Sequence, residues 1–123
     1  MDTPMEEILR QAQGLGQAIR QHPRYRKLME TDAKVRADPA ATEAVEAYNR
    51  AYGGLVQKEQ RGQPIEVDEK HRLDRLKQVV AANETFKTFL KAQADYAELM
   101  QQMNAAIFKA ISGGGQGDGA APA

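Results

Sequence analysis

Residues 84–111 read ETFKTFLKAQADYAELMQQMNAAIFKAI and carry two apolar stripes at spacings of three and four. One stripe holds Phe86, Leu90, Ala97, Met100, Ile107 and Ile111, and the other holds Phe89, Ala92, Tyr96, Leu99, Met103 and Ala110. This spacing predicts an α-helix, whose length at 1.5 Å per residue is about 42 Å. Because each apolar stripe needs a neighbour to cover it, we expect a helix that is central to the fold or shared with another subunit.

Four further helices are expected upstream of this segment, over residues 4–21, 23–37, 39–61 and 68–82. The breaks between them fall at His22-Pro23, Asp38-Pro39 and Gly62. Proline disfavours helical geometry in the residue before it, Asp is a good N-cap before a first-turn proline, and glycine ends helices readily. We expect Asp68 to cap the fourth helix and Asn83 to separate it from the last.

The fold class that follows is all-α, with about five helices in an antiparallel bundle and a long C-terminal helix. No alternating apolar run is long enough to build a sheet. At 123 residues the chain suits one helical domain over residues 1–112, followed by a Gly/Ala-rich tail over 113–123 that we expect to be disordered. Leu, Ile, Val and Phe together number only 22, so the core is lean and an oligomer would bury more surface.

Composition excludes several classes of protein. The chain has no Cys, which rules out disulfides and thiolate metal sites. No apolar run approaches the roughly 18 residues of a membrane span, and the acidic start of the sequence does not resemble a signal peptide. We therefore expect a cytoplasmic protein without membrane contact. Lys and Arg, 17 in number, balance 17 Asp and Glu, which argues against a general nucleic-acid binder.

Reactive centres are not expected either. The histidines are His22 and His71, and a metal site would need His71 to act with Asp68 or Asp74. We favour a solvated acidic start of a helix over that site, and we expect its carboxylates to have ordinary pKa values. There is a single serine, and no glycine cluster follows a strand as a phosphate loop would. The expectation is a protein with no metal, no cofactor and no catalytic activity.

The end of the last helix is a candidate interface. A helix of this length extends past a compact small domain, which is roughly 30 Å across, and its end is still apolar. Exposed apolar surface of this kind marks interaction sites. The candidate residues for self-association or partner binding are Phe89, Tyr96, Leu99, Met103, Ile107, Phe108 and Ile111.

Basic residues offer a second, weaker candidate. One cluster surrounds the first helix junction, at Arg20, Arg24, Arg26 and Lys27, and another lies on the fourth helix, at Lys70, Arg72, Arg75 and Lys77. Together they could face RNA phosphates or an acidic partner. Acidic residues interrupt the second cluster, so we favour a solubilising role.

The order of these features resembles the YlbF/YmcA family of small helical bacterial regulators. The resemblance covers about residues 5–111. It rests on the stretch from Ile8 to Ile19, on His22-Pro23 with Tyr25 and Leu28, on the stretch from Ala37 to Ala41, on Gln60 with Gly62, and on Asn83, Phe86, Phe89, Leu90, Ala92, Gln93, Leu99 and Met100. The resemblance implies an all-α domain that assembles as a dimer or larger oligomer. It also implies action without catalysis, in a complex with a third protein that modulates ribonuclease Y and mRNA maturation. Some members are reported to bind iron–sulfur clusters through cysteines, and this chain has none to supply.

The function expected from the sequence is therefore that of a non-catalytic regulatory or scaffolding protein. It would act through protein–protein interaction, with itself and with another protein, and its target would be RNA-processing machinery such as ribonuclease Y. Two alternatives stay open. One is an RNA-binding adaptor that uses the cluster from Arg20 to Lys27, and the other is a small holdase-like chaperone that uses the apolar end of the last helix.

Overall fold

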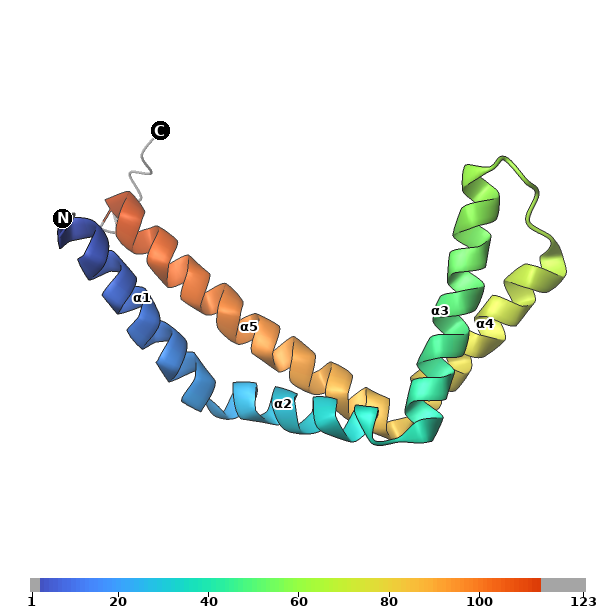
Figure 1. Ribbon diagram of the computed structural model, residues 1–123, viewed down its shortest axis with the longest axis horizontal. Helices are drawn as coiled ribbons and strands as arrows, with labels where there is room; N and C mark the ends of the chain where they lie inside the picture. The colour runs from blue at the N-terminus through green and yellow to red at the C-terminus, as the bar shows by residue number, and fades with distance from the viewer. Residues whose placement is uncertain (1–2, 114–123) are drawn as a thin grey trace. The chain divides into compact units, whose positions relative to one another are not determined.

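The computed structural model describes residues 3–113, and five α-helices account for nearly all of them. They are α1 (Thr3–Gln21), α2 (Pro23–Arg36), α3 (Pro39–Gln60), α4 (Val67–Ala82) and α5 (Glu84–Gly113) (Figure 1). No strand occurs over this range, and the predicted all-α class, with its long C-terminal helix, is confirmed. The helix α5 includes Gly113, which we had placed in the tail, and the expected disorder of 114–123 lies outside the described residues.

The predicted breaks are confirmed at α3. The Asp38 Oδ1 atom accepts a hydrogen bond from the Ala40 N–H at 3.1 Å, and Pro39 opens the helix behind this cap. At the other end Gly62 has a φ of 69°, a left-handed conformation that glycine adopts without steric cost. The Gln63 N–H then donates to the Lys58 carbonyl at 2.8 Å, so the final turn of α3 is closed by backbone hydrogen bonds.

The start of α4 corrects one expectation. Its N-cap is Glu66, not Asp68, which lies inside the first turn. The Glu66 N–H donates to the Glu69 Oε1 atom at 2.9 Å, the reciprocal pattern of a capping box. At the far end Asn83 separates α4 from α5 as expected, and its Oδ1 atom accepts from the Phe86 N–H at 2.8 Å.

The helices form two compact units. Unit 2, Met29–Lys91, is built on the antiparallel hairpin of α3 and α4, and it also holds the end of α2 and the start of α5 (Figure 1). Its buried side chains are Thr31, Ala41 and Ala44. Such small residues let the surrounding helices approach closely, and the larger apolar side chains are left half-buried or exposed.

Unit 1 holds, among the described residues, 3–28 and 92–113: α1, the start of α2 and the greater part of α5. The rings of Tyr25 and Tyr96 lie 5.8 Å apart between centroids and are tilted by 57°. Beside them Arg24 donates to the Glu98 carboxylate and to the Asp95 carbonyl, each at 2.9 Å. Across the described part of this unit Ala92 is the one buried residue, so unit 1 has almost no core of its own.

Candidate protein-interaction surface

The helix α1 presents an apolar face to solvent. Of the five helices it separates apolar from polar residues most strongly, and none of its residues is buried. The side chain of Ile8 is 65% exposed, and Leu9 beside it is 52% exposed. We call the exposed residues Met5, Ile8, Leu9 and Leu15 the α1 apolar face. An amphipathic helix of this kind normally covers a core, and here its apolar side is open.

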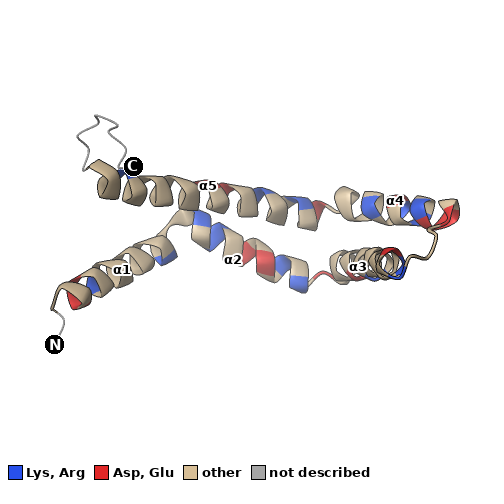
Figure 2. Cartoon of the chain, turned by 90° about the horizontal axis from the view of Figure 1, so that it is seen from above, with Lys and Arg blue, Asp and Glu red and all other residues tan. Residues whose placement is uncertain are grey.

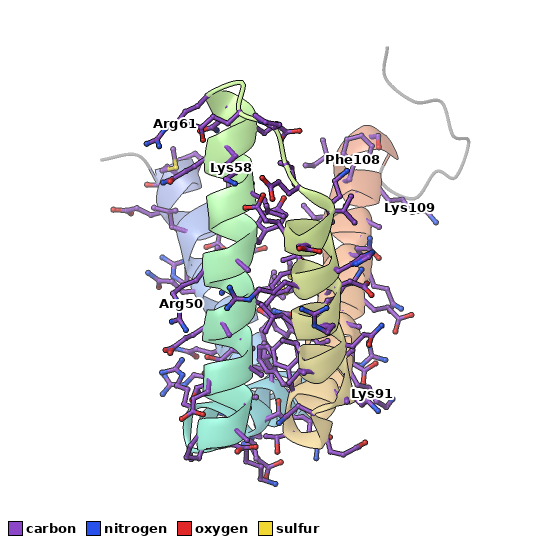
Figure 3. All side chains as sticks on the ribbon, turned by 90° about the vertical axis from the view of Figure 1, so that its right-hand side faces the viewer. Arg50, Lys58, Arg61, Lys91, Phe108 and Lys109 are labelled. Carbon is purple, nitrogen blue, oxygen red and sulfur yellow. The ribbon has the colours of Figure 1, made fainter. Side chains whose placement is uncertain are left out.

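The last turns of α5 are also apolar and exposed. Phe108 is 69% exposed and Ile111 is 76% exposed, with Ile107 preceding them on the same helix. Figure 3 shows Phe108 projecting from the end of α5. We call Ile107, Phe108 and Ile111 the α5 end. Its residues belong to unit 1, as do those of the α1 apolar face.

Between these two surfaces α1 and α5 meet over a limited region. Leu15, Ala18 and Ile19 of α1, His22 at the break after α1, and Leu99 and Met103 of α5 line a hollow of about 170 Å³. All of the α1 residues in it come from the second half of the helix. Figure 2 shows that α1 and α5 diverge from there toward the N-terminus of α1. The surface is thus continuous with a partly open apolar hollow.

The residues predicted for this interface fall into three groups. Ile107, Phe108 and Ile111 are exposed, whereas Leu99 and Met103 are half-buried in the hollow against α1. Tyr96 is half-buried against Tyr25. Phe89 belongs to unit 2 instead, where its ring lies 6.0 Å from that of Phe86. The structure therefore brings six of the seven into unit 1 and sets Phe89 apart.

The sequence-based prediction missed the α1 apolar face. Its signal is present in the spacing of Met5, Ile8, Leu15 and Ile19, which forms one apolar stripe. An apolar stripe shows that something covers a helix, but it does not distinguish a core from another chain.

Two arginines of the basic cluster at the first helix junction are engaged within the chain. Arg24 pairs with Glu98, and Arg26 donates to the Gln21 side chain. Guanidinium groups that are already held by carboxylate and amide oxygens are poorly placed to contact phosphates. This arrangement favours a structural role for the cluster.

One carboxylate departs from the ordinary pKa that we expected. Lys58 donates to the Glu69 Oε2 atom at 2.6 Å, and this hydrogen bond, together with that from the Glu66 N–H, lowers the pKa of Glu69. His71 and Asp74 lie on the same helix, but over residues 3–113 no three His, Cys, Asp or Glu side chains are grouped as metal ligands. Over the same range no helix has the length and apolarity of a membrane span.

Known proteins resemble this chain over most of its length. A UPF0342 protein of Streptococcus pyogenes serotype M4 is 26% identical over 103 residues, which cover 84% of this chain and 91% of the relative. The corresponding protein of serotype M49 is also 26% identical, and that of serotype M5 is 25% identical, with the same coverage. These names assign no catalytic activity.

The sequence model of one family matches residues 8–112, which include the whole α1–α5 hollow and the α5 end. That family is described as control of the competence regulator ComK, which is a regulatory role. The matched range reaches from Ile8 on the α1 apolar face to the last turn of α5. The helical chain with this apolar surface belongs to the YlbF/YmcA family of competence regulators.

Proposed function

We propose that this protein is a non-catalytic regulator that acts in the cytoplasm by binding other protein chains through unit 1. The observation that carries the proposal is the exposure of the α1 apolar face and the α5 end in a unit whose described part buries one alanine. Apolar surface of this kind marks interaction sites. The regulatory description of the family supports the same conclusion.

Energetics supports association. Burial of one fully exposed large apolar side chain contributes about 1.5–3 kcal/mol. The seven side chains of the α1 apolar face and the α5 end are between 38% and 76% exposed, so each can gain a part of this. The cost of bringing two chains together is about 4–15 kcal/mol. The surface is therefore large enough in principle to offset that cost, and a second copy of the chain offers an equally apolar surface.

The partner other than a second copy is, in this proposal, a component of the RNA-processing machinery such as ribonuclease Y. Regulation would then consist of occupying or presenting a surface, since apolar side chains pack and do not take part in proton transfer or nucleophilic attack. The RNA-adaptor alternative receives no support from Arg24 and Arg26, which are held within the chain. No specific observation favours the other alternative, a holdase-like chaperone that binds unfolded proteins.

The partner experiment compares two variants of α1. Ile8→Glu places a charge on the α1 apolar face, and Gln13→Glu places the same charge at another exposed position of the helix. Purified ribonuclease Y is passed over the immobilised full chain, and surface plasmon resonance records binding. We expect binding by the wild type and by Gln13→Glu, and at least a tenfold loss with Ile8→Glu. Absence of binding by the wild type would exclude ribonuclease Y as the partner, and equal binding by all three would exclude the α1 apolar face.

A further inference from the structure

A second surface lies in unit 2, on the hairpin of α3 and α4, and it differs from unit 1 in being charged. A hollow of about 200 Å³ is lined there by Arg50, Ala51, Gly54, Leu55, Lys58, Glu69 and Arg72. We call it the hairpin hollow. Figure 3 shows Arg50 and Lys58 along α3, with Arg61 beyond them at the loop end of the helix. The lining holds three cations and one anion, and therefore carries a net positive charge.

One pair of these charges is already matched. The Lys58 Nζ atom lies 2.6 Å from the Glu69 Oε2 atom, and both side chains are about one third exposed. This ion pair joins α3 to α4 at one side of the hollow. The Glu69 carboxylate is paired with Lys58, and no ion pair joins it to either arginine of the described chain.

Arg50 and Arg72 have no such match. Neither forms an ion pair or a side-chain hydrogen bond with the part of the chain that the structure describes, and both are exposed. The two helices of the hairpin thus each contribute one arginine to the lining of the same hollow. A guanidinium group presents a planar fork of donors that binds a carboxylate in a bidentate manner.

The floor between the two arginines suits a short side chain. Gly54 adds no side chain, and a Cβ atom built on it would have no neighbour within 4 Å. Ala51 and Leu55 add apolar surface. A Glu or Asp side chain entering the hollow would place its methylene groups on this floor and its oxygens within reach of the arginines.

We propose that the hairpin hollow binds carboxylate side chains from an acidic segment of a protein partner. Arg50 and Arg72 bind the carboxylates, Gly54 leaves the space for them, and the Lys58–Glu69 pair holds the two helices in register. None of the residues that line the hairpin hollow belongs to unit 1. Its failure would leave the proposed self-association of unit 1 unaffected.

An acidic protein segment suits this surface better than a nucleic acid does. Residues 39–82 carry seven basic and seven acidic side chains, so the hairpin as a whole is neutral. Nucleic-acid binding surfaces normally show a clear excess of basic residues.

The direct test follows the two arginines by NMR. The uniformly ¹⁵N-labelled full chain is titrated with a hexaglutamate peptide, and in parallel with a hexauridylate oligonucleotide at the same concentrations. We expect hexaglutamate to shift the Nε–Hε resonances of Arg50 and Arg72 in a saturable way, and those of Arg61 and Arg75 much less. No shift with millimolar hexaglutamate, or equal shifts at all four arginines, would overturn the proposal.

Two pairs of variants test the same site with matched controls. A double variant that carries Arg50→Glu and Arg72→Glu is compared with a double variant that carries Arg61→Glu and Arg75→Glu. The second makes the same change of net charge outside the hollow. Gly54→Gln fills the hollow without any change of charge, and Gly53→Gln adds the same side chain at the adjacent position, where it also meets no neighbour. Circular dichroism checks that each variant stays helical.

The expected outcome is at least a tenfold weaker binding of fluorescent hexaglutamate by the first charge-reversal pair and by Gly54→Gln. The second charge-reversal pair and Gly53→Gln should change the affinity for hexaglutamate by less than threefold. Equal weakening by both charge-reversal pairs would mean diffuse electrostatic attraction and would overturn the site. Preferential binding of hexauridylate that depends on Arg50 and Arg72 would assign the hollow to nucleic acid instead.

Discussion

At the scale of single residues, Glu69 takes part both in an ion pair with Lys58 and in the capping box of α4. Glu69 accepts from the Lys58 ammonium and from the Glu66 N–H, and these hydrogen bonds to its ionised form lower its pKa. Folding therefore favours the carboxylate over the protonated acid. The resulting stabilisation is present above the pKa that a Glu side chain has in the unfolded chain, about 4.3. It is lost as the pH falls through the lower pKa that Glu69 has in the folded chain.

Glu69→Gln tests this linkage. Gln at this position can still accept from the Glu66 N–H, because capping boxes use Glu or Gln, but it loses the charge that pairs with Lys58. We expect the variant to melt at a lower temperature than the wild type at pH 7. The difference in melting temperature between the two proteins should disappear as the pH falls through the pKa that Glu69 has in the folded chain. Thermal melts followed by circular dichroism between pH 7 and pH 3 measure this difference. A difference in melting temperature that does not change with pH would refute the role of the charge.

Single residues also show what could be predicted from the sequence. Asp38, Pro39 and Gly62 act locally, through a cap, a fixed φ and a left-handed turn, so the pattern alone places them correctly. The cap of α4 was misplaced because Glu66 and Glu69 act reciprocally. Asp68 has the more typical capping side chain, and only the geometry of the turn decides between them.

At the scale of the elements, α3 is weakened by two glycines in its middle. Gly53 and Gly54 are exposed, and a Cβ atom at either would meet nothing within 4 Å. Glycine in a helix interior costs roughly 0.5–1 kcal/mol relative to alanine. Their presence is therefore not explained by packing within the described chain, although Gly54 leaves room in the hairpin hollow.

Gly53→Ala should stabilise the chain by about 0.5–1 kcal/mol, since alanine restricts the unfolded chain and fits the helix. Urea unfolding followed by circular dichroism gives the free energy of unfolding. Gly62→Ala is the control, and it should destabilise by about 1–2 kcal/mol because its φ of 69° is left-handed. A loss of stability with Gly53→Ala would show that a neighbour occupies the space beside this glycine.

The elements also explain why the seven predicted interface residues fall into two units. Periodicity locates a stripe on a helix, and all seven candidates do lie on α5. Periodicity does not tell which stripe residue faces which neighbour, so Phe89 was grouped with Phe108 although it lies beside Phe86 in the other unit. For the same reason the apolar stripe of α1 does not tell what covers it, and none of the residues of α1 is buried.

At the scale of the whole molecule, the small number of large apolar residues in the sequence corresponds to a small buried core. The described chain buries Thr31, Ala41, Ala44 and Ala92, and its large apolar side chains are half-buried or exposed. Small domains with little core commonly gain stability by oligomerising. The proposed association of unit 1 thus serves folding and regulation together, and a chain that binds a second copy would become more stable with concentration.

Sedimentation velocity on the full chain, from 1 to 100 μM, tests the central claim most directly. We expect the wild type and Gln13→Glu to sediment with at least twice the 13.6 kDa mass of one chain. Ile8→Glu should shift toward the monomer, because a charge on the α1 apolar face cannot be buried without a large cost. A wild type that stays monomeric at 100 μM, or an Ile8→Glu variant that assembles as the wild type does, would contradict the account.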